Sequence, residues 1–331
     1  MASRNCLMRL KTFQLITTSF NPPNGIAFSR GFCASPPVFQ TKWLQAVSHA
    51  EKVVGNPTFL NLESVTSHEI SNMAVYLKNL IKTGHPLTST VKELLNPKAK
   101  NDLTRGLLVL LVSKAGKHKA NEDILPNQRK LAEITEQIHT AHIIHTGIIN
   151  LATPNENLEM GNKMAILCGD FIQSRSSIQL AELKNIKIIE LFGQAIADFS
   201  AVEFINEDTY CALDLWTQKT KMRYGTLLSN ACQSTLILGG NMDLLESAKN
   251  FGLEIAFAWQ ANIDLQSYKS TTKKAEHNLA KLFPGTPFEE ILLIFEAVRD
   301  KHINASLKIL AKFPQNDACL ALCDIAKALK Y

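Results

Sequence analysis

Apolar residues recur at helical spacing along almost the whole of this chain, and this periodicity restricts the fold more than any other feature. Residues 128–149 show it most clearly, and the apolar positions on one side of that segment are Leu131, Ile134, Ile138, Ala141 and Ile148. The same spacing predicts helices over residues 67–82, 101–115, 160–180, 182–203, 212–238, 241–266, 287–299, 303–312 and 315–329. Proline and glycine punctuate these segments, and no alternating run predicts a strand. The sequence therefore predicts a single all-α domain of about ten to twelve helices over residues 39–331.

The N-terminal segment differs from the rest of the chain. The first acidic residue is Glu51, and five basic residues precede it: Arg4, Arg9, Lys11, Arg30 and Lys42. Ser and Thr are frequent in the same segment. This composition predicts a mitochondrial transit peptide over residues 1–38, with a plain disordered N-terminus as the alternative. The net charge of +5 comes from this segment. The remainder is nearly neutral, which gives no reason to expect a nucleic-acid partner.

Hydropathy and cysteine spacing exclude several classes of protein. The longest apolar run in the predicted domain covers residues 107–112, far below the roughly 20 residues that span a bilayer. The seven cysteines form no CxxC pair, which argues against a zinc site and against a disulfide scaffold. Cys319 and Cys323 stand four residues apart, on one face of a predicted helix.

Four segments, in order, resemble the trans-isoprenyl diphosphate synthase family. Residues 104–107 resemble its basic segment that holds isopentenyl diphosphate, and residues 133–150 resemble the helix that carries its first aspartate-rich motif. Residues 161–171 match its Gly-Asn-Lys…Gly-Asp block, the most specific of the four. Residues 219–264 resemble its Lys-Thr segment and second aspartate-rich motif. The resemblance implies one large helical bundle and a chemistry in which Mg²⁺ neutralises a departing diphosphate.

This chain departs from the family at the residues that perform that chemistry. Thr146, Gly147 and Asn150 occupy the positions of the first aspartate-rich motif. Ile263, Asp264 and Ser267 occupy those of the second, so one carboxylate remains. Arg223 and Tyr224 replace the family's Lys-Thr pair. A single carboxylate cannot organise several magnesium ions, so we expect the chain to have no catalytic residues and to bind no metal or cofactor by itself.

These losses together resemble one branch of the family, the non-catalytic second subunits of mitochondrial long-chain polyprenyl diphosphate synthases. The resemblance implies a matrix protein that pairs with an aspartate-complete first subunit as a heterotetramer. In that arrangement Mg²⁺ belongs to the partner, isoprenoid diphosphates are handled by the complex, and the product serves as the ubiquinone side chain. The product chain length is open.

Five residues are candidates for residual diphosphate contacts: Arg105, Asn162, Lys163, Asp170 and Gln260. The competing interpretation of residues 161–169 is a close helix-packing segment with Asp170 paired internally. A second cluster of basic residues, Lys219, Lys221 and Arg223, is expected to form a solvated face. For Asp264 we expect a surface or helix-capping role.

His139, His142 and His145 stand three apart on one predicted helix. Glu136 and His139 also mimic half of a di-iron motif, but the chain holds no second Glu-x-x-His after the N-terminal segment, so packed histidines are expected. The apolar stripe of Ile188, Leu191, Phe192, Ala195, Ile196 and Phe199 is expected to be core, with a partner-facing surface as the alternative.

Three rival functions remain. One is an active prenyltransferase or terpene cyclase with an unusual metal site, and another is a metal-binding helical bundle. The third is a stand-alone isoprenoid-binding or scaffold protein that kept only the fold.

Overall fold

A computed structural model describes residues 37–55, 104–116, 124–148 and 156–330. Of the predicted transit peptide, only residues 37 and 38 fall within these ranges. The predicted helix over residues 67–82 and Asn150 lie outside them. Within them the chain is all-α, as predicted, with no strand. None of the helices in the described ranges is both long and apolar enough to cross a bilayer.

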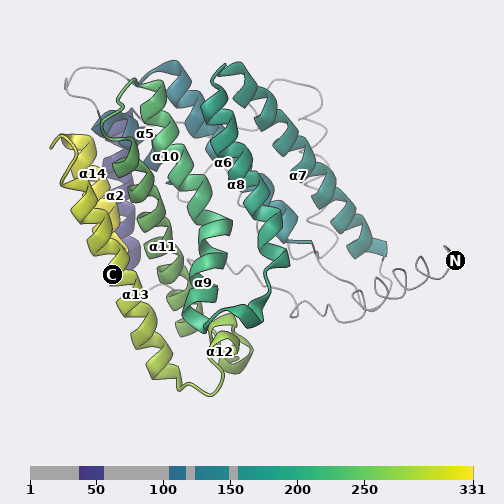
Figure 1. Ribbon diagram of the computed structural model, residues 1–331. Helices are drawn as coiled ribbons and strands as arrows, with labels where there is room; N and C mark the ends of the chain where they lie inside the picture. The colour runs from purple at the N-terminus through teal and green to yellow at the C-terminus, as the bar shows by residue number, and fades with distance from the viewer. Residues whose placement is uncertain (1–36, 56–103, 117–123, 149–155, 331) are drawn as a thin grey trace, which may run out of the picture.

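Helix α5 (Thr104–Ala115) is the centre of the bundle. Every residue in it except Lys114 is buried, because its sequence is apolar on all sides. It packs against α2 (Pro37–Val54), α6 (Pro126–Thr146), α10 (Thr226–Leu238) and α14 (Asp317–Ala328). These helices run side by side around it (Figure 1). Residues from both ends of the chain therefore enclose one core.

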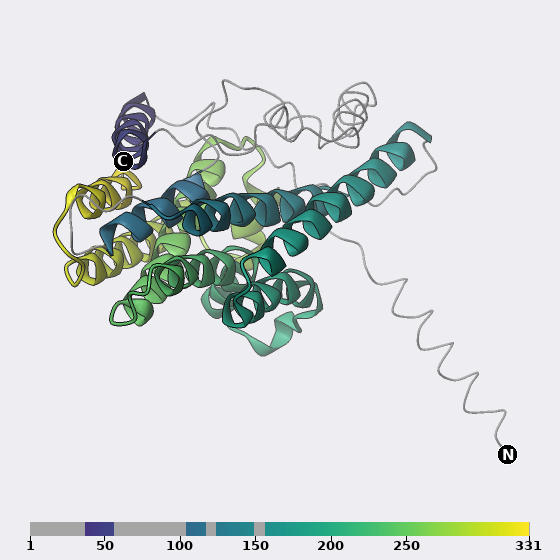
Figure 2. The ribbon, with the colours of Figure 1, turned by 90° about the horizontal axis from the view of Figure 1, so that it is seen from above.

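The remaining long helices extend this core. α7 (Glu156–Glu182) packs mainly on α6 and projects from the bundle, as Figure 2 shows from above. α8 (Ile186–Ala201) packs on α10, and two short 3₁₀ turns, η3 (Val202–Phe204) and η4 (Glu207–Thr209), lead to α9 (Ala212–Thr220). α11 (Leu245–Ser270) lies between α10 and α13 (Phe288–Leu310), while η6 (Lys274–Glu276) and the short α12 (Asn278–Leu282) connect α11 to α13.

Local sequence signals fix where several helices begin. Asn185 accepts a hydrogen bond from the Ile188 N–H at 3.2 Å at the start of α8, and Asn316 accepts one from the Cys319 N–H at 3.0 Å at the start of α14. Gln128 caps α6 and also donates from Nε2 to the Thr235 carbonyl at 2.8 Å. That last bond ties the start of α6 to α10.

Three predicted boundaries were wrong. Residues 287–299 and 303–312 form one continuous helix, α13, because no glycine or proline interrupts residues 299–303. Residues 212–238 are interrupted by a π-helical turn, η5 (Lys221–Gly225). α7 begins at Glu156, whereas the sequence predicted a loop up to residue 160 and a helix from there. The π turn lies where α11 comes close, since a Cβ on Gly225 would stand 2.8 Å from the Leu253 side chain.

The stripe predicted on α8 is core. Ile188, Phe192 and Ala195 are fully buried, and Ile196 and Phe199 pack against the same cluster. The alternative, a partner-facing surface made by these residues, is wrong for the three that are fully buried.

Two helical glycines give opposite expectations for substitution by alanine. A Cβ on Gly252 would stand 2.7 Å from the Leu228 carbonyl oxygen and 2.7 Å from the Ser229 Cα, so backbone atoms would have to move. On Gly193 a Cβ would meet nothing within 4 Å. We predict that Gly252→Ala lowers the free energy of unfolding by about 1–3 kcal/mol. Gly193→Ala should raise it by about 0.5–1 kcal/mol, because alanine favours the helix.

Urea titrations followed by circular dichroism measure both changes. Equal effects of the two substitutions would contradict the close approach of α10 and α11 at Gly252.

Candidate functional site

The positions of the first aspartate-rich motif lie at the C-terminal end of α6 and serve the backbone there. Thr146 Oγ1 donates to the Ile143 carbonyl at 3.1 Å, and the Gly147 N–H closes the helix on the Ile144 carbonyl at 3.2 Å. Neither residue offers a charge to a cation. Asn150 lies outside the described residues.

Asp264, the carboxylate at the positions that resemble the second aspartate-rich motif, is half-buried. Its Oδ2 accepts a hydrogen bond from Trp216 Nε1 at 2.8 Å, and its Oδ1 accepts one from Gln260 Nε2 at 2.8 Å. Burial raises the pKa of Asp264 to about 6, against the opposing effect of these two donors and of the Arg223 charge. The carboxylate therefore joins α9 to α11 at a half-buried position and caps no helix end.

Ser267 has also become a structural residue. The N–H of Leu279 donates to His277 Nδ1 at 3.2 Å, so the ring proton is on Nε2, which donates to Ser267 Oγ at 3.1 Å. His277 therefore cannot accept the serine proton, and the pair is no nucleophile. Burial lowers the pKa of His277 to about 4, which keeps the ring neutral. The pair holds the start of α12 against α11.

Arg223 and Tyr224, at the Lys-Thr positions, lie in the π turn η5. Arg223 Nη2 forms an ion pair with Glu203 at 2.8 Å, and Lys219 pairs with Glu207. Both acids belong to the 3₁₀ turns that follow α8. Of the basic cluster expected to be a solvated face, only Lys221 is fully exposed, while the other two charges are met by carboxylates.

The three histidines of α6 contact different side chains. His139 faces the edge of the Tyr224 ring at 6.4 Å, and His142 stacks on Phe199 with 4.0 Å between ring centroids. Burial, helped by the charges of Arg223 and Arg105, lowers the pKa of His142 to about 3, so this ring is neutral. His145 pairs with Asp170 at 3.2 Å. In the described part of the chain, no three His, Cys, Asp or Glu residues are grouped as a metal site would require.

The Asp170 pairing belongs to close contact between α6 and α7. A Cβ on Gly169 would stand 2.2 Å from His145 Nε2, so the His145 ring would have to move if Gly169 were replaced by a larger residue. Ala165 and Cys168 are buried in the same stretch. Lys163 is exposed and Asn162 half-buried. These contacts favour the packing interpretation of residues 161–169, and diphosphate contacts by Asn162, Lys163 and Asp170 stay predictions.

Arg105 lies buried at the start of α5, above an aromatic stack. Its guanidinium is 4.9 Å from the centroid of the Trp259 ring, and Trp259 in turn lies 5.5 Å from Trp43. Arg105, Tyr224, Trp259, Gln260 and three apolar residues, Leu228, Ala256 and Ile263, line a cavity of about 10 Å³. A space of this size holds a single water molecule, so these side chains leave no room for a substrate in this cavity.

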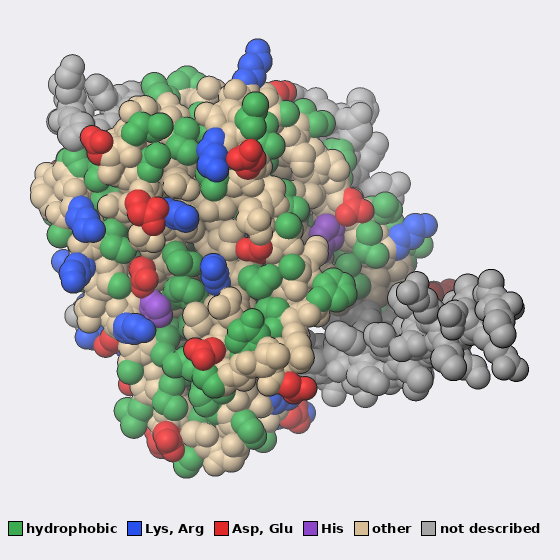
Figure 3. All heavy atoms as spheres, viewed as in Figure 1, with side chains coloured by type: hydrophobic (Ala, Val, Ile, Leu, Met, Phe, Trp, Pro, Cys, Tyr) green, Lys and Arg blue, Asp and Glu red, His purple; other side chains and the backbone are tan. Residues whose placement is uncertain are grey.

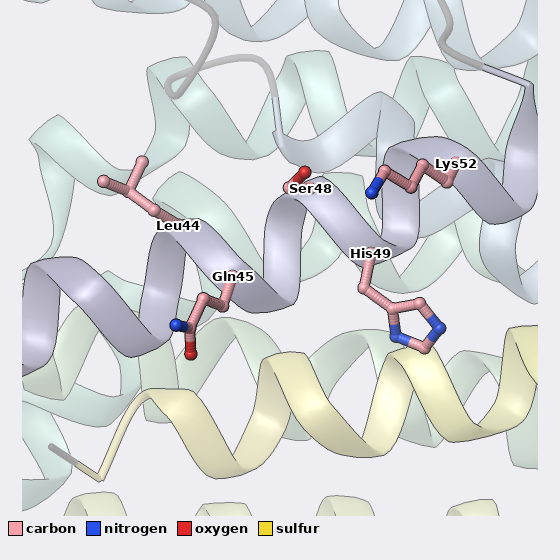
Figure 4. Close-up of a pocket in the computed structure, with 5 residues that line it drawn as sticks. All are labelled: Leu44, Gln45, Ser48, His49 and Lys52. Carbon is pink, nitrogen blue, oxygen red and sulfur yellow. The ribbon is translucent and has the colours of Figure 1, made fainter.

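A second hollow lies on the outer face of α2. Leu44, Gln45, Ser48, His49 and Lys52 line it, and Figure 4 shows them along one side of the helix. It is open to solvent, with a volume of about 480 Å³, and none of its residues was a candidate from the sequence. His49 pairs with Asp324 of α14 at 3.4 Å.

Of the residues that complete this interior, only Phe199 was identified from the sequence, as part of the apolar stripe of α8. Trp216, Phe199 and Glu203 each meet a partner on another element, at separations of 48, 57 and 20 residues respectively (264 − 216, 199 − 142 and 223 − 203).

The raised pKa of Asp264 predicts a pH dependence of stability with a definite sign. Its pKa is 3.8 in ordinary surroundings and about 6 in the folded chain, so between these values the folded state binds more protons than the unfolded state. The free energy of unfolding contributed by Asp264 is complete below the lower value and falls as pH rises to the upper one. In Asp264→Asn this contribution is absent.

Urea unfolding of the wild type and Asp264→Asn across this pH window checks the prediction. The free energy of unfolding of the wild type, relative to that of Asp264→Asn, should decrease with rising pH and then stay constant. Parallel curves would contradict it, and Asp208→Asn, at an exposed carboxylate, controls for the lost charge.

Comparison with known proteins places this arrangement in a family. The all-trans-polyprenyl-diphosphate synthase PDSS2 of Mus musculus is 34% identical over 255 residues, and that of Homo sapiens is 35% identical over 254 residues. Each match covers 68% of this chain and 63% of the relative, so the chain spans less than two thirds of the length of these relatives. A probable mitochondrial hexaprenyl pyrophosphate synthase of Neurospora crassa is 35% identical over 175 residues, 47% of this chain and 38% of that protein.

Solved structures share the fold at low sequence identity. A decaprenyl diphosphate synthase from Rhodobacter capsulatus gives a TM-score of 0.57 at 18% identity, covering 88% of this chain and 97% of that one. A geranyltranstransferase from Methanosarcina mazei gives a TM-score of 0.59 at 20% identity, covering 77% of this chain and 95% of that one. The polyprenyl synthetase family model matches residues 85–281. The chain belongs to the polyprenyl synthetase family.

Proposed function

We propose that this chain is a non-catalytic subunit of a mitochondrial long-chain polyprenyl diphosphate synthase. It acts with an aspartate-complete subunit that binds Mg²⁺ and carries out chain extension for the ubiquinone side chain. The names of the mitochondrial hexaprenyl synthases and of PDSS2 among its relatives support this substrate class, and the former support a mitochondrial location.

The observation that carries the proposal is how Asp264, the carboxylate at the second motif, is hydrogen-bonded. Mg²⁺ in this family needs several carboxylate oxygens around a diphosphate. Asp264 is the only acid at the described motif positions, and both of its oxygens already accept hydrogen bonds, from Trp216 and Gln260. The residues present do not fit Mg²⁺, so we assign no chemical step to this chain.

The filled interior also bears on how the subunit contributes. In the described residues, the cavity beside Arg105 and Trp259 has room for one water molecule and none for an isoprenoid. This favours stabilisation of the partner through contact over a lipid-binding tunnel inside this chain. It also disfavours the rival function of a stand-alone isoprenoid-binding protein.

The outer faces of α7 and α8 are the surface we assign to the partner. Apolar side chains are exposed there, namely Met160, Ile166, Leu167 and Ile178 on α7 and Ile186 and Ile189 on α8. Over the face turned to the viewer, hydrophobic side chains lie among the charged ones (Figure 3). Gly193 lies on the same helix as Ile189 and has open space beside it. A helical glycine without an internal contact permits close approach of a second helix.

Co-expression tests the proposal. Full-length chain alone, and together with an aspartate-complete polyprenyl synthase subunit from the same organism, would be assayed with farnesyl and isopentenyl diphosphates and Mg²⁺. We predict no extension by the chain alone, co-purification with the partner, and long-chain synthesis by the pair above that of the partner alone.

Two substitutions make the result specific to the surface. Leu167→Glu on α7 should abolish co-purification, because it buries a charge in the interface. Leu293→Glu on α13, at a leucine that is more exposed than Leu167, should leave co-purification unchanged. Extension by the chain alone would show that the missing carboxylates are not needed. Failure to bind any partner would favour the scaffold function.

A further inference from the structure

Charge is distributed unevenly along this chain, and its C-terminal helices hold an excess of lysine. Residues 301–330 contain five lysines and two aspartates, a net charge of +3. Residues 156–300 contain thirteen basic and nineteen acidic residues, a net charge of −6. The five lysines are all exposed and lie in the second half of α13, in the turn after it, and in or just beyond α14: Lys301, Lys308, Lys312, Lys327 and Lys330.

Three of these lysines follow one side of α13. Lys301 and Lys308 are seven residues apart, so they lie two turns from each other on the same side of the helix, and Lys312 follows one turn later. The opposite side of α13 belongs to the core, where Ile303 and Leu310 are buried. The lysine side of α13 therefore faces away from the bundle.

The outer side of α14 continues this charged surface. Lys327 lies two turns from Leu320 on the same side of the helix, and Leu320 is 52% exposed, so an apolar side chain stands among the lysines. Lys330 Nζ pairs with Asp300 of α13 at 3.1 Å, which places the C-terminal end of α14 beside Lys301. The two helices pack against each other, and Lys and Arg side chains gather along that edge of the molecule in Figure 3.

The chain itself neutralises little of this positive charge. Within the described residues, all of the five lysines except Lys330 lack an ion pair. The acidic side chains close to them already have partners, since Asp300 pairs with Lys330 and Asp324 pairs with His49 of α2. Asp317, in the first turn of α14, is the other acid of this segment. An excess of cations is therefore turned toward the solvent.

We propose that the five lysines and Leu320, here called the basic surface, dock this chain on an anionic lipid bilayer. The ammonium groups lie among the phosphates of the lipid headgroups, and Leu320 enters the boundary of the acyl chains. Each lysine close to such a membrane strengthens binding by about fivefold, so four unpaired lysines together hold a protein at the surface. An exposed leucine among lysines suits this occupant better than it suits an acidic protein.

A bilayer also suits the product of the proposed complex, and in this respect the inference rests on the proposed function. A long polyprenyl chain is costly to move through water, because every apolar carbon adds to the free energy of its exposure. A synthase held on the bilayer releases the chain without that passage. Figure 1 and Figure 2 show α14 and the projecting α7 on opposite sides of the bundle, so docking leaves the surface assigned to the partner open.

Sedimentation of the full chain with vesicles tests this inference. We expect binding to vesicles of phosphatidylcholine and phosphatidylglycerol at about two to one, little binding to phosphatidylcholine alone, and loss of binding at high salt. The combined substitutions Lys301→Glu, Lys308→Glu and Lys312→Glu should lower the partition coefficient by about tenfold or more.

A matched variant controls for the change in net charge. Lys187→Glu, Lys221→Glu and Lys281→Glu combined reverse three exposed lysines on α8, η5 and α12, and should have a much smaller effect. Both triple variants keep the basic residues that precede Glu51, so any lipid binding by that segment is the same in each. Circular dichroism establishes that both are folded.

Fluorescence locates the contact within the chain. The three native tryptophans are buried, so a tryptophan at an exposed position reports separately on its surroundings. The emission of Leu320→Trp should shift to shorter wavelength when anionic vesicles are added, whereas that of Ile178→Trp on α7 should not.

Equal binding of the two triple variants, or no binding of the wild type to anionic vesicles at low salt, would overturn the inference. Binding to soluble polyglutamate without binding to vesicles would also overturn it and assign the basic surface to an acidic protein. These measurements use the chain without a partner subunit, so their outcome is separate from that of the co-purification that tests the proposed function.

Discussion

Burial of α5 on every side is the constraint on which the rest of the molecule depends. A helix with apolar residues all round must be enclosed, and α2, α6, α10 and α14 provide the enclosure from distant parts of the chain. Its N-terminal backbone is satisfied inside the protein, where the Gly106 N–H donates to the buried Glu136 Oε1 at 2.6 Å. This bond fixes the end of α5 against α6.

The candidate site lies at that fixed end. Arg105, beside Gly106, stacks over Trp259, and the rings of Tyr224, His139 and His142 pack close by. The positions that resemble the family's aspartate-rich motifs hold a helix cap, a Trp-linked carboxylate and a serine bonded to histidine. The side chains at these positions are half-buried and hydrogen-bonded within their own helix or to a neighbouring one. Neutral and aromatic groups can be packed in this way where several carboxylates cannot.

The sequence predicted the fold well and the site only in part. Periodicity located the long helices from α5 onwards, since apolar spacing is a local property, and it identified the core stripe of α8. It did not predict α2 or the short α12. It missed the continuity of α13 and the π turn at Lys221–Gly225, which depends on how closely α11 approaches. It did not predict the hydrogen bonds of Asp264. Nothing in the local sequence announces that a tryptophan 48 residues away will donate to that carboxylate.

The central claim is that this interior is structural and binds no magnesium diphosphate. Calorimetric titration of the chain alone with a non-hydrolysable farnesyl diphosphate analogue, with and without Mg²⁺, tests it most directly. The account predicts no Mg²⁺-dependent heat of binding, in the wild type as in Asp264→Asn. Stoichiometric binding that requires Mg²⁺ and disappears in Asp264→Asn would contradict it.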